Sequence, residues 1–134
     1  MNSQAIFCVT SKGVELALKI NEKFESDIFV LEKFVVHKTI SFNSLKEIVR
    51  ENFLEYRYLV FIMATGIVVR VIDGKSTTKD KDPGVITVDE QANFVIPILS
   101  GHLGGANESC RKIASGIKAI PVITTATDVS GKIA

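Results

Sequence analysis

Three glycines, a histidine and one serine lie between Ser100 and Glu108, and these residue types can together bind an anion. An apolar run at residues 94–99 precedes them and predicts a buried strand, and an apolar stripe of helical spacing follows them. A strand that turns through glycines into a helix leaves free N–H groups at the helix start, where the helix dipole favours negative charge. We therefore expect a carboxylate or phosphate pocket at this turn, with His102 at its mouth.

Two interpretations of His102 remain open on the residues alone. An imidazole, whose ordinary pKa is about 6.5, could serve there as a general acid or base. A histidine at a helix start can instead simply bond a neighbouring backbone group. Arg70 has a similar pair of interpretations, because it could bind a ligand carboxylate bidentately or extend into solvent. Glu108 fits a solvated helix face as well as a ligand contact.

Polar turns also follow other predicted strands, at residues 10–13, 64–66 and 124–128. Ligands of open α/β sheets bind beyond the carboxyl ends of the strands. If the strands are parallel, these turns and the glycine-rich turn meet along one edge of the sheet. The candidate substrate-binding residues are Thr65, Gly66, Arg70, Ser100, Gly101, Gly104, Gly105, Asn107, Glu108, Thr125 and Asp128.

Other kinds of site find little support in the sequence. His102 has no second histidine at a metal-ligand spacing, and Cys110 falls on an apolar stripe, so we predict no metal site. The glycines have neither a following GK[ST] nor the GxGxxG spacing, which argues against a nucleotide-binding domain. Ser100 also lacks the preceding glycine of a nucleophile elbow.

The composition indicates one domain without an electrostatic preference for nucleic acid or membranes. The 134 residues are 46% hydrophobic and carry a formal net charge of +1. Cys8 and Cys110 both fall in apolar patterns, which favours buried, reduced thiols over a disulfide. The sequence shows no signal peptide and no apolar run of membrane-spanning length, so a cytoplasmic location is expected.

Short apolar runs alternate with amphipathic segments along the chain. Thr10 and Ser11 can cap a first helix, and Ser44 with Glu47 matches a capping box. The pattern predicts strands at residues 5–9, 28–31, 58–63, 85–88, 94–99 and 119–123, a weaker continuation at 34–36, and helices beginning near residues 11, 45, 67 and 103.

This alternation predicts an α/β fold, a three-layer sandwich with a mostly parallel sheet formed by a single domain over residues 1–134. The runs at residues 85–88 and 94–99 are too close for a helical crossover and predict one antiparallel hairpin. Residues 129–134 contain no closing element. We therefore expect the chain to be part of a longer protein or to be covered there by a partner.

Several segments, taken together and in this order, resemble the N-terminal region of the CbiG family of cobalamin-biosynthesis proteins. The resemblance is strongest from Met63 onward, and the SGHLGGANE segment is the most specific. The segments are MATGIVVR (63–70), KDP (81–83), VDE (88–90), FVIP (94–97), SGHLGGANE (100–108) and PVITTATD (121–128).

The resemblance implies a cobalt-precorrin-5A hydrolase of the anaerobic pathway to vitamin B12. Such an enzyme opens the δ-lactone of a cobalt corrinoid, and a two-carbon fragment leaves as acetaldehyde. Family members usually carry a further C-terminal domain, which is not in this sequence. The expected partners are the corrinoid and either that C-terminal domain or a second copy of the chain. The cobalt is expected to arrive with the substrate, so no cofactor of the protein itself is expected.

Lactone opening needs water activated by a base and donors for the developing oxyanion. His102 is the candidate base, and the N–H groups near Gly104 and Gly105 are candidate donors. The alternative is a tetrapyrrole-binding module that needs a separate C-terminal domain for catalysis.

Overall fold

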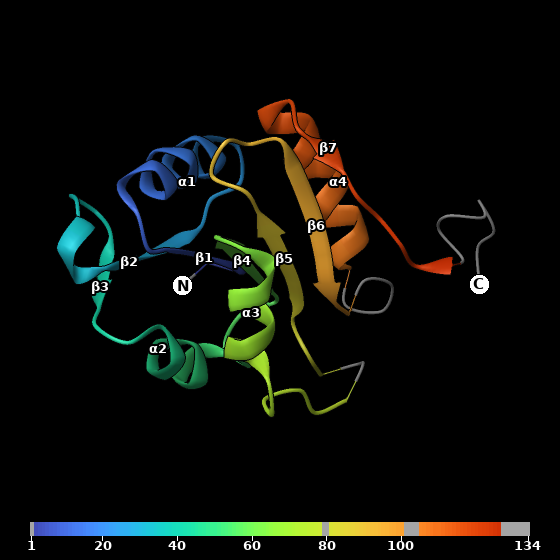
Figure 1. Cartoon of the computed structure of the whole chain (residues 1–134), viewed down its shortest axis with the longest axis horizontal. Helices are drawn as coiled ribbons and strands as arrows, with labels where there is room; N and C mark the ends of the chain where they lie inside the picture. The colour runs from blue at the N-terminus through green and yellow to red at the C-terminus, as the bar shows by residue number, and fades with distance from the viewer. Residues whose placement is uncertain (1, 79–80, 101–104, 127–134) are drawn as a thin grey trace.

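A computed structural model describes residues 2–78, 81–100 and 105–126 (Figure 1). Strands and helices alternate along most of the chain, as the sequence predicts. The elements are β1 (Gln4–Cys8), α1 (Ser11–Lys23), β2 (Asp27–Leu31), η1 (Glu32–Phe34), β3 (Ile40–Phe42), α2 (Leu45–Asn52), β4 (Tyr58–Ile62), α3 (Thr65–Ile72), β5 (Gly84–Val88), β6 (Phe94–Leu99), α4 (Ala106–Ile117) and β7 (Ile120–Pro121).

The described strands form one seven-stranded sheet in the order β3-β2-β1-β4-β5-β6-β7. Strands β1 to β5 run parallel to their neighbours, whereas β5 and β6 form an antiparallel hairpin. Strand β7 is parallel to β6, so its direction is also opposite to that of β1 and β4. The predicted fold class, a mostly parallel α/β sheet with one antiparallel pair, is confirmed.

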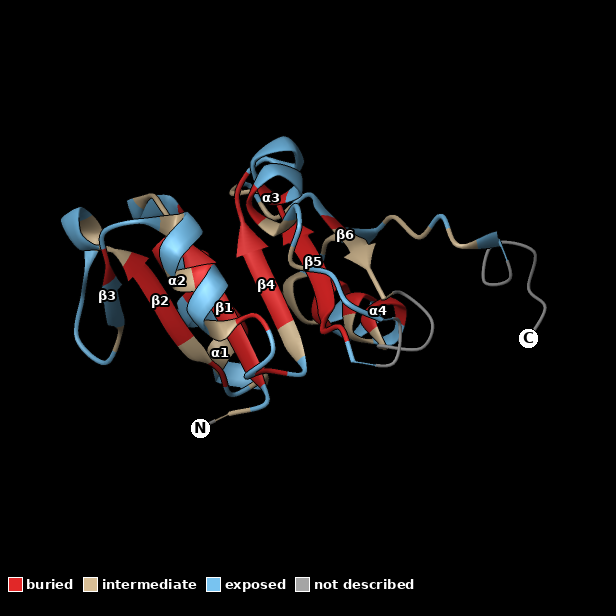
Figure 2. Ribbon diagram, turned by 90° about the horizontal axis from the view of Figure 1, so that it is seen from below, coloured by how far each residue is buried: buried red, intermediate tan, exposed pale blue. Residues whose placement is uncertain are grey.

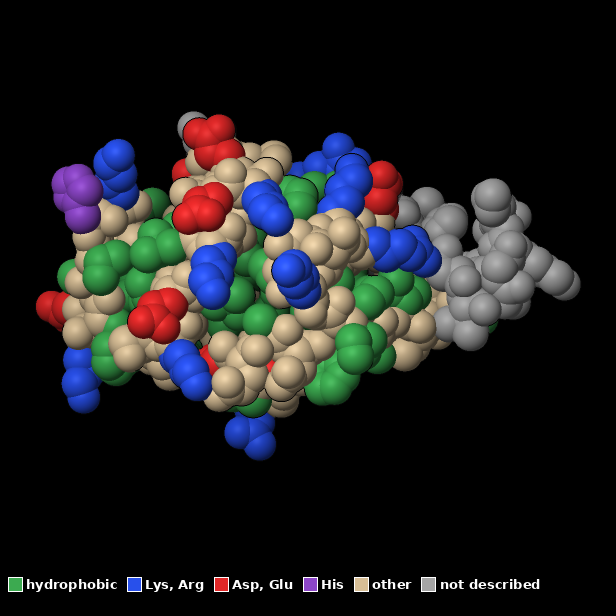
Figure 3. Space-filling view, turned by 90° about the horizontal axis from the view of Figure 1, so that it is seen from above, with side chains coloured by type: hydrophobic (Ala, Val, Ile, Leu, Met, Phe, Trp, Pro, Cys, Tyr) green, Lys and Arg blue, Asp and Glu red, His purple; other side chains and the backbone are tan. Residues whose placement is uncertain are grey.

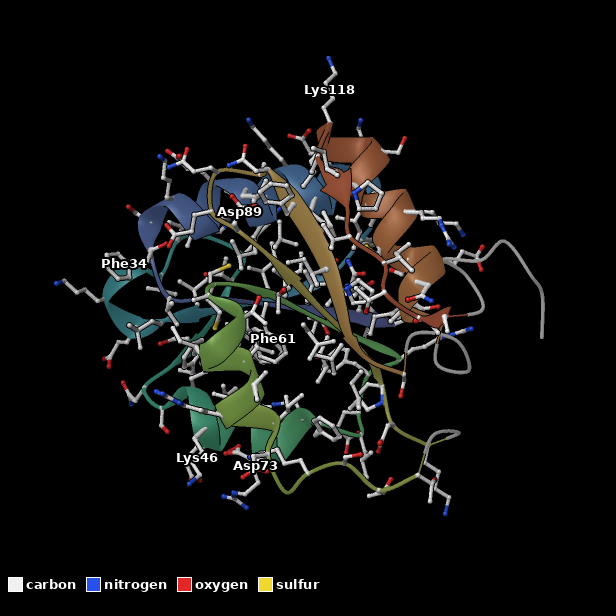
Figure 4. The ribbon with its side chains drawn as sticks, turned by 45° about the vertical axis from the view of Figure 1, so that its right-hand side comes forward. Phe34, Lys46, Phe61, Asp73, Asp89 and Lys118 are labelled. Atoms are coloured by element: carbon white, nitrogen blue, oxygen red, sulfur yellow. The ribbon has the colours of Figure 1, made fainter. Side chains whose placement is uncertain are left out.

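The helices cover both faces of the sheet and complete the three layers. Helices α1 and α4 share one hydrophobic cluster with the sheet, and α2 and α3 share the other. Figure 2 shows the central strands as buried between the helices, whose outer faces are exposed. Phe7 stacks between Phe29 and Phe61 with ring centroids 5.0 and 4.9 Å apart. Phe61 lies behind α3 in Figure 4, while Lys46 and Asp73 point outward.

Local sequence signals explain how the first two helices begin. The Gly13 N–H donates to Thr10 Oγ1 at 3.0 Å, and the Glu47 N–H donates to Ser44 Oγ at 3.2 Å, so both predicted N-caps are confirmed. Helix α3 forms despite its β-branched residues, because Val68 and Val71 are buried against the sheet. Its tertiary packing therefore outweighs a weak helix propensity.

The structure differs from the prediction near both edges of the sheet. Residues 34–36 do not continue β2; a short 3₁₀-helix ends at Phe34, and the chain then turns at His37 and Lys38. The sequence analysis missed β3, where only Phe42 is buried. The last strand is confined to Ile120–Pro121, shorter than predicted.

Both cysteines are free and buried, as predicted. Burial raises the pKa of the Cys8 thiol to about 12 and that of Cys110 to about 11. No described helix is long and apolar enough to cross a membrane.

Candidate functional site

The sheet has two ends, and the candidate residues lie at both. Strands β1, β4 and β5 finish side by side, with Cys8 paired to Ile62 and Ile62 to Val88; we call this end the carboxyl edge. At the other end Leu99 finishes β6 beside Val85 of β5. We call that end, where α4 also begins, the glycine-loop edge.

The prediction that all the polar turns meet along one edge is wrong. Thr10 and Thr65 follow β1 and β4 at the carboxyl edge, whereas Ser100 follows β6 at the glycine-loop edge. Thr125 also lies at the glycine-loop edge, because it contacts Asn107 in the first turn of α4. The cause is the β5–β6 hairpin, which reverses the chain so that the strands beyond it end on the opposite side.

Two threonines at the carboxyl edge link neighbouring elements through their hydroxyl groups. Thr10 caps α1, and its hydroxyl also donates to Glu90 Oε2 at 2.9 Å, which links the start of α1 to the turn between β5 and β6. Thr65 Oγ1 lies 3.4 Å from Thr87 Oγ1 and so links the start of α3 to β5. The hydroxyls of Thr10 and Thr65 therefore link neighbouring elements to each other.

The start of α3 is nevertheless open to solvent. No side chain caps it, and a Cβ atom placed on Gly66 would meet nothing within 4 Å. Thr65 is exposed, as is Arg70 in the last turn, which forms no ion pair with any described residue. Of the predicted binding residues, Thr65, Gly66 and Arg70 are thus accessible, but they lie on α3, which begins at the opposite end of the sheet from Asn107 and Thr125.

At the glycine-loop edge α4 begins in close contact with β4 and β5. Gly105 has φ +80°, and a Cβ atom there would lie 2.9 Å from Tyr58 Oη. A Cβ atom on Gly84 would lie 3.1 Å from the Ala106 Cβ. The Ala106 N–H donates to the Ser100 carbonyl at 3.3 Å, closing the turn across the glycines. Both the backbone conformation and the space beside Tyr58 therefore favour glycine at position 105.

Asn107 joins two of the segments that carry the family resemblance. Its side chain is 3% exposed, and Nδ2 donates to Thr125 Oγ1 at 3.1 Å. The SGHLGGANE segment and the PVITTATD segment are therefore brought together at one end of α4. This contact supports the predicted grouping of Asn107 with Thr125.

A cleft of about 450 Å³ opens beside this helix start. The Arg57 guanidinium lies 5.3 Å from the centre of the Tyr58 ring, and Glu108 forms a 3.3 Å ion pair with Lys112. Arg57 is exposed and has no ion-pair partner among the described residues. The cleft is lined by Ser3, Gln4, Phe24, Glu25, Arg57, Tyr58, Glu108, Ser109 and Lys112.

Sequence reasoning included Glu108 but missed the rest of this cleft. Its members come from the start of β1, the end of α1 and the start of β4, which lie far from α4 in the chain. An arginine between two tyrosines, Tyr56 and Tyr58, was the available signal. This pattern lies at a strand start, whereas ligands of parallel sheets usually bind beyond the carboxyl ends of the strands.

Gly101, His102, Gly104 and Asp128 lie outside the described residues, so the predicted catalytic base stays a prediction. The structure does place the residues on either side of 101–104, Ser100 and Gly105, at the glycine-loop edge. Among the described residues no three His, Cys, Asp or Glu side chains are grouped so as to hold a metal ion.

A buried carboxylate closes the loop that leads into β5. Asp82 accepts hydrogen bonds from Ser76 Oγ, the Thr77 N–H at 2.7 Å and Thr77 Oγ1 at 2.9 Å. Burial alone would raise the pKa of Asp82, but these hydrogen bonds outweigh it and lower the pKa below its usual value. The aspartate of the KDP segment therefore has a structural role.

The fold and these segments agree with a known protein family. Residues 47–128, more than half of the chain, match the family described as Cobalamin synthesis G N-terminal, and the chain belongs to that family. It is 43% identical over 129 residues to the cobalt-precorrin-5A hydrolase of Salmonella typhimurium, covering 96% of this chain. The cobalt-precorrin-5A hydrolase of Priestia megaterium is 37% identical over 132 residues, covering 93% of this chain.

A solved structure, titled as a cobalamin biosynthesis protein G homologue from Sulfolobus solfataricus, has the same fold. It superposes with a TM-score of 0.70 and 24% sequence identity over 91% of this chain and 36% of its own length. The curated relatives are also longer, because the matched region is 37% of the Salmonella protein and 35% of the Priestia protein. This chain therefore spans little more than a third of the proteins it resembles.

Proposed function

We propose that this chain is the N-terminal part of a cobalt-precorrin-5A hydrolase and that it binds the cobalt corrinoid at the glycine-loop edge. We place the binding site at this edge because Asn107 contacts Thr125 there, beside a cleft of about 450 Å³. Relatives with that activity in their names match nearly the whole chain, which supports the choice of substrate.

The cleft has groups suited to the acidic arms of a corrinoid. The Arg57 guanidinium can form two parallel hydrogen bonds to a carboxylate, and its position over the Tyr58 ring orients it. The positive end of the α4 dipole lies at the same place and favours negative charge. Ser3 and Ser109 add hydroxyl groups that can donate to carboxylate or amide oxygens. The cleft is large enough for one edge of a macrocycle and its substituents.

We propose His102 as the base that activates water for lactone opening. In the sequence it lies between Ser100 and Gly105, and an added Cβ on Gly105 would contact Tyr58, which lines the cleft. Water would add to the lactone carbonyl as His102 accepts its proton, and backbone N–H groups near Gly104 and Gly105 would stabilise the oxyanion. Collapse of this intermediate would break the C–O bond to the ring oxygen, giving a carboxylate on the macrocycle and an alcohol on the two-carbon unit. Loss of the alcohol proton would then form the C=O of acetaldehyde as the C–C bond to the macrocycle breaks, and the electron pair of that bond would stay on the macrocycle. The cobalt ion would enter with the substrate.

A second candidate function is a corrinoid-binding module that is inactive alone. The observation that favours it is the share of the relatives that this chain spans, 37% for the Salmonella protein. In that case the remaining region of such enzymes would supply catalytic groups. Saturable binding of the corrinoid by residues 1–134 without acetaldehyde release would identify this second function.

The test is acetaldehyde release from cobalt-precorrin-5A. The protein would consist of residues 1–134 followed by the remaining region of the Salmonella relative, and the product would be measured with alcohol dehydrogenase and NADH. We expect His102→Ala to lower the rate roughly a hundredfold or more. His37→Ala is the matched control, because His37 is exposed in the turn before β3, and β3 is the outermost strand on the opposite side of the sheet from β6 and β7. Undiminished release by His102→Ala would exclude the proposed base, and no release by the unaltered protein would contradict the activity.

A further inference from the structure

One half of a sheet face is left uncovered by the described helices. Helix α4 packs on β5, β6 and β7 from one side, and Val95 is fully buried beneath it. On the opposite side α2 and α3 pack with the cluster centred on β1 and β4. In Figure 1 no helix crosses the front of β6, while α4 lies behind it.

The side chains on this uncovered face are apolar. Phe94 of β6 pairs with Ile120 of β7, so both point to the same side of the sheet, and they are 44% and 59% exposed. Ile96 points the same way as its partner Thr87, whose hydroxyl lies beside Thr65 of α3. We call Phe94, Ile96 and Ile120 the β6–β7 patch, and it lies on the face of the sheet that carries α3.

Helix α3 extends the patch. Val69 is 50% exposed and stands one helical turn after Thr65, so it is on the side of α3 that faces β5. Figure 3 shows hydrophobic side chains at the surface between the charged ones on one face of the molecule. Apolar side chains gathered in this way mark a contact surface more often than scattered exposed residues do.

We propose that the β6–β7 patch is the surface on which the remaining region of CbiG proteins packs, through an apolar face of its own. The relatives of this chain are nearly three times as long as the matched region, which is 37% of the Salmonella protein. Strand β7 is the outermost strand of the described sheet and supplies Ile120 to the patch, so no further described strand covers this side of it. The inference rests on family membership and concerns assembly, not the chemistry of lactone opening.

Hydroxyl-radical footprinting measures the exposure of these side chains directly. Residues 1–134 alone would be compared with the longer protein in which the remaining region of the Salmonella relative follows. We expect Phe94 and Ile120 to react at least about fivefold more slowly in the longer protein. Leu54 is the matched control, because it is 59% exposed, as Ile120 is, and lies after α2 instead. Its reactivity should be the same in both proteins.

Substitutions give a second measurement. Ile120→Asp should lower the Tm of the longer protein by several degrees more than that of residues 1–134 alone, whereas Leu54→Asp should affect the two equally. Equal reactivity of Phe94 and Ile120 in both proteins, with an equal effect of Ile120→Asp, would overturn the proposal. Concentration-dependent protection of Phe94 in residues 1–134 alone would overturn it too, because a second copy would then cover the patch.

Acetaldehyde release by the longer protein separates this proposal from the proposed function. Release without protection of Phe94 and Ile120 contradicts only the packing surface. Protection without release contradicts only the activity.

Discussion

Replacement of Gly105 by alanine tests how α4 is fixed at the glycine-loop edge. The backbone there has φ +80°, which costs an alanine about 1–2 kcal/mol. The new Cβ would also lie 2.9 Å from Tyr58 Oη, and such overpacking costs roughly 1–3 kcal/mol. The unfolded chain loses entropy with alanine, which returns about 0.4–1 kcal/mol. We expect a net loss of about 2–4 kcal/mol in the free energy of unfolding.

Gly74 offers a matched control, because it has φ +77° but nothing within 4 Å of an added Cβ. Gly74→Ala should therefore cost only about 1 kcal/mol. Urea unfolding followed by circular dichroism measures both changes. In a Tyr58→Phe background, which lacks the hydroxyl, the cost of Gly105→Ala should approach that of Gly74→Ala. Equal costs of the two glycine substitutions in the unaltered background would refute the close contact between α4 and β4.

Three further predictions concern stability and thiol chemistry. Asp82→Asn should lower the free energy of unfolding by about 1–2 kcal/mol at pH 7. Because the folded-state pKa of Asp82 is lowered, the stability advantage of the aspartate should persist above the ordinary carboxyl pKa and disappear as the pH falls below about 4. Urea unfolding at several pH values measures this advantage. Thr10→Val should cost more than Ser44→Ala, which removes a cap worth about 1 kcal/mol, because Thr10 also donates to a glutamate; equal Tm losses would contradict this. Cys8 and Cys110 should react with a disulfide reagent at pH 8 at least roughly a hundredfold more slowly in the native protein than in urea, since burial raises both pKa values, and rapid native reaction would be the opposite result.

The sequence predicted the central part of the fold well. Local signals there agree with tertiary packing, as at Thr10 and Ser44, whose caps start the first two helices. Predictions failed at the edge strands, where burial is weak. Only Phe42 of β3 is buried, so no apolar run marks that strand. Both residues of β7 are exposed. The nitrogen of Pro121 lies on the open side of this edge strand, because the Ile120 and Val122 N–H groups on either side of it donate to carbonyls of Asn93 and Val95.

The candidate site was predicted only in part. The contact between Asn107 and Thr125 joins two segments whose residue types had suggested binding. The prediction that Thr65 and Thr125 lie at one edge was wrong. The predicted antiparallel hairpin already implies this result, because β6 runs against β5 and must end at the opposite edge. Arg57 was missed because it enters the cleft through packing between distant elements, which residue spacing does not reveal.

Equilibrium titration of residues 1–134 with cobalt-precorrin-5A, followed by the corrinoid absorbance, tests the proposed binding edge most directly. We predict saturable binding that Arg57→Ala weakens about tenfold or more, as loss of a hydrogen-bonded charge would do. Lys12→Ala is the comparison, since Lys12 is exposed in the first turn of α1 at the carboxyl edge, and it should change the Kd less than about twofold. Binding weakened by Lys12→Ala and unaffected by Arg57→Ala would place the corrinoid at the other end of the sheet and contradict the account.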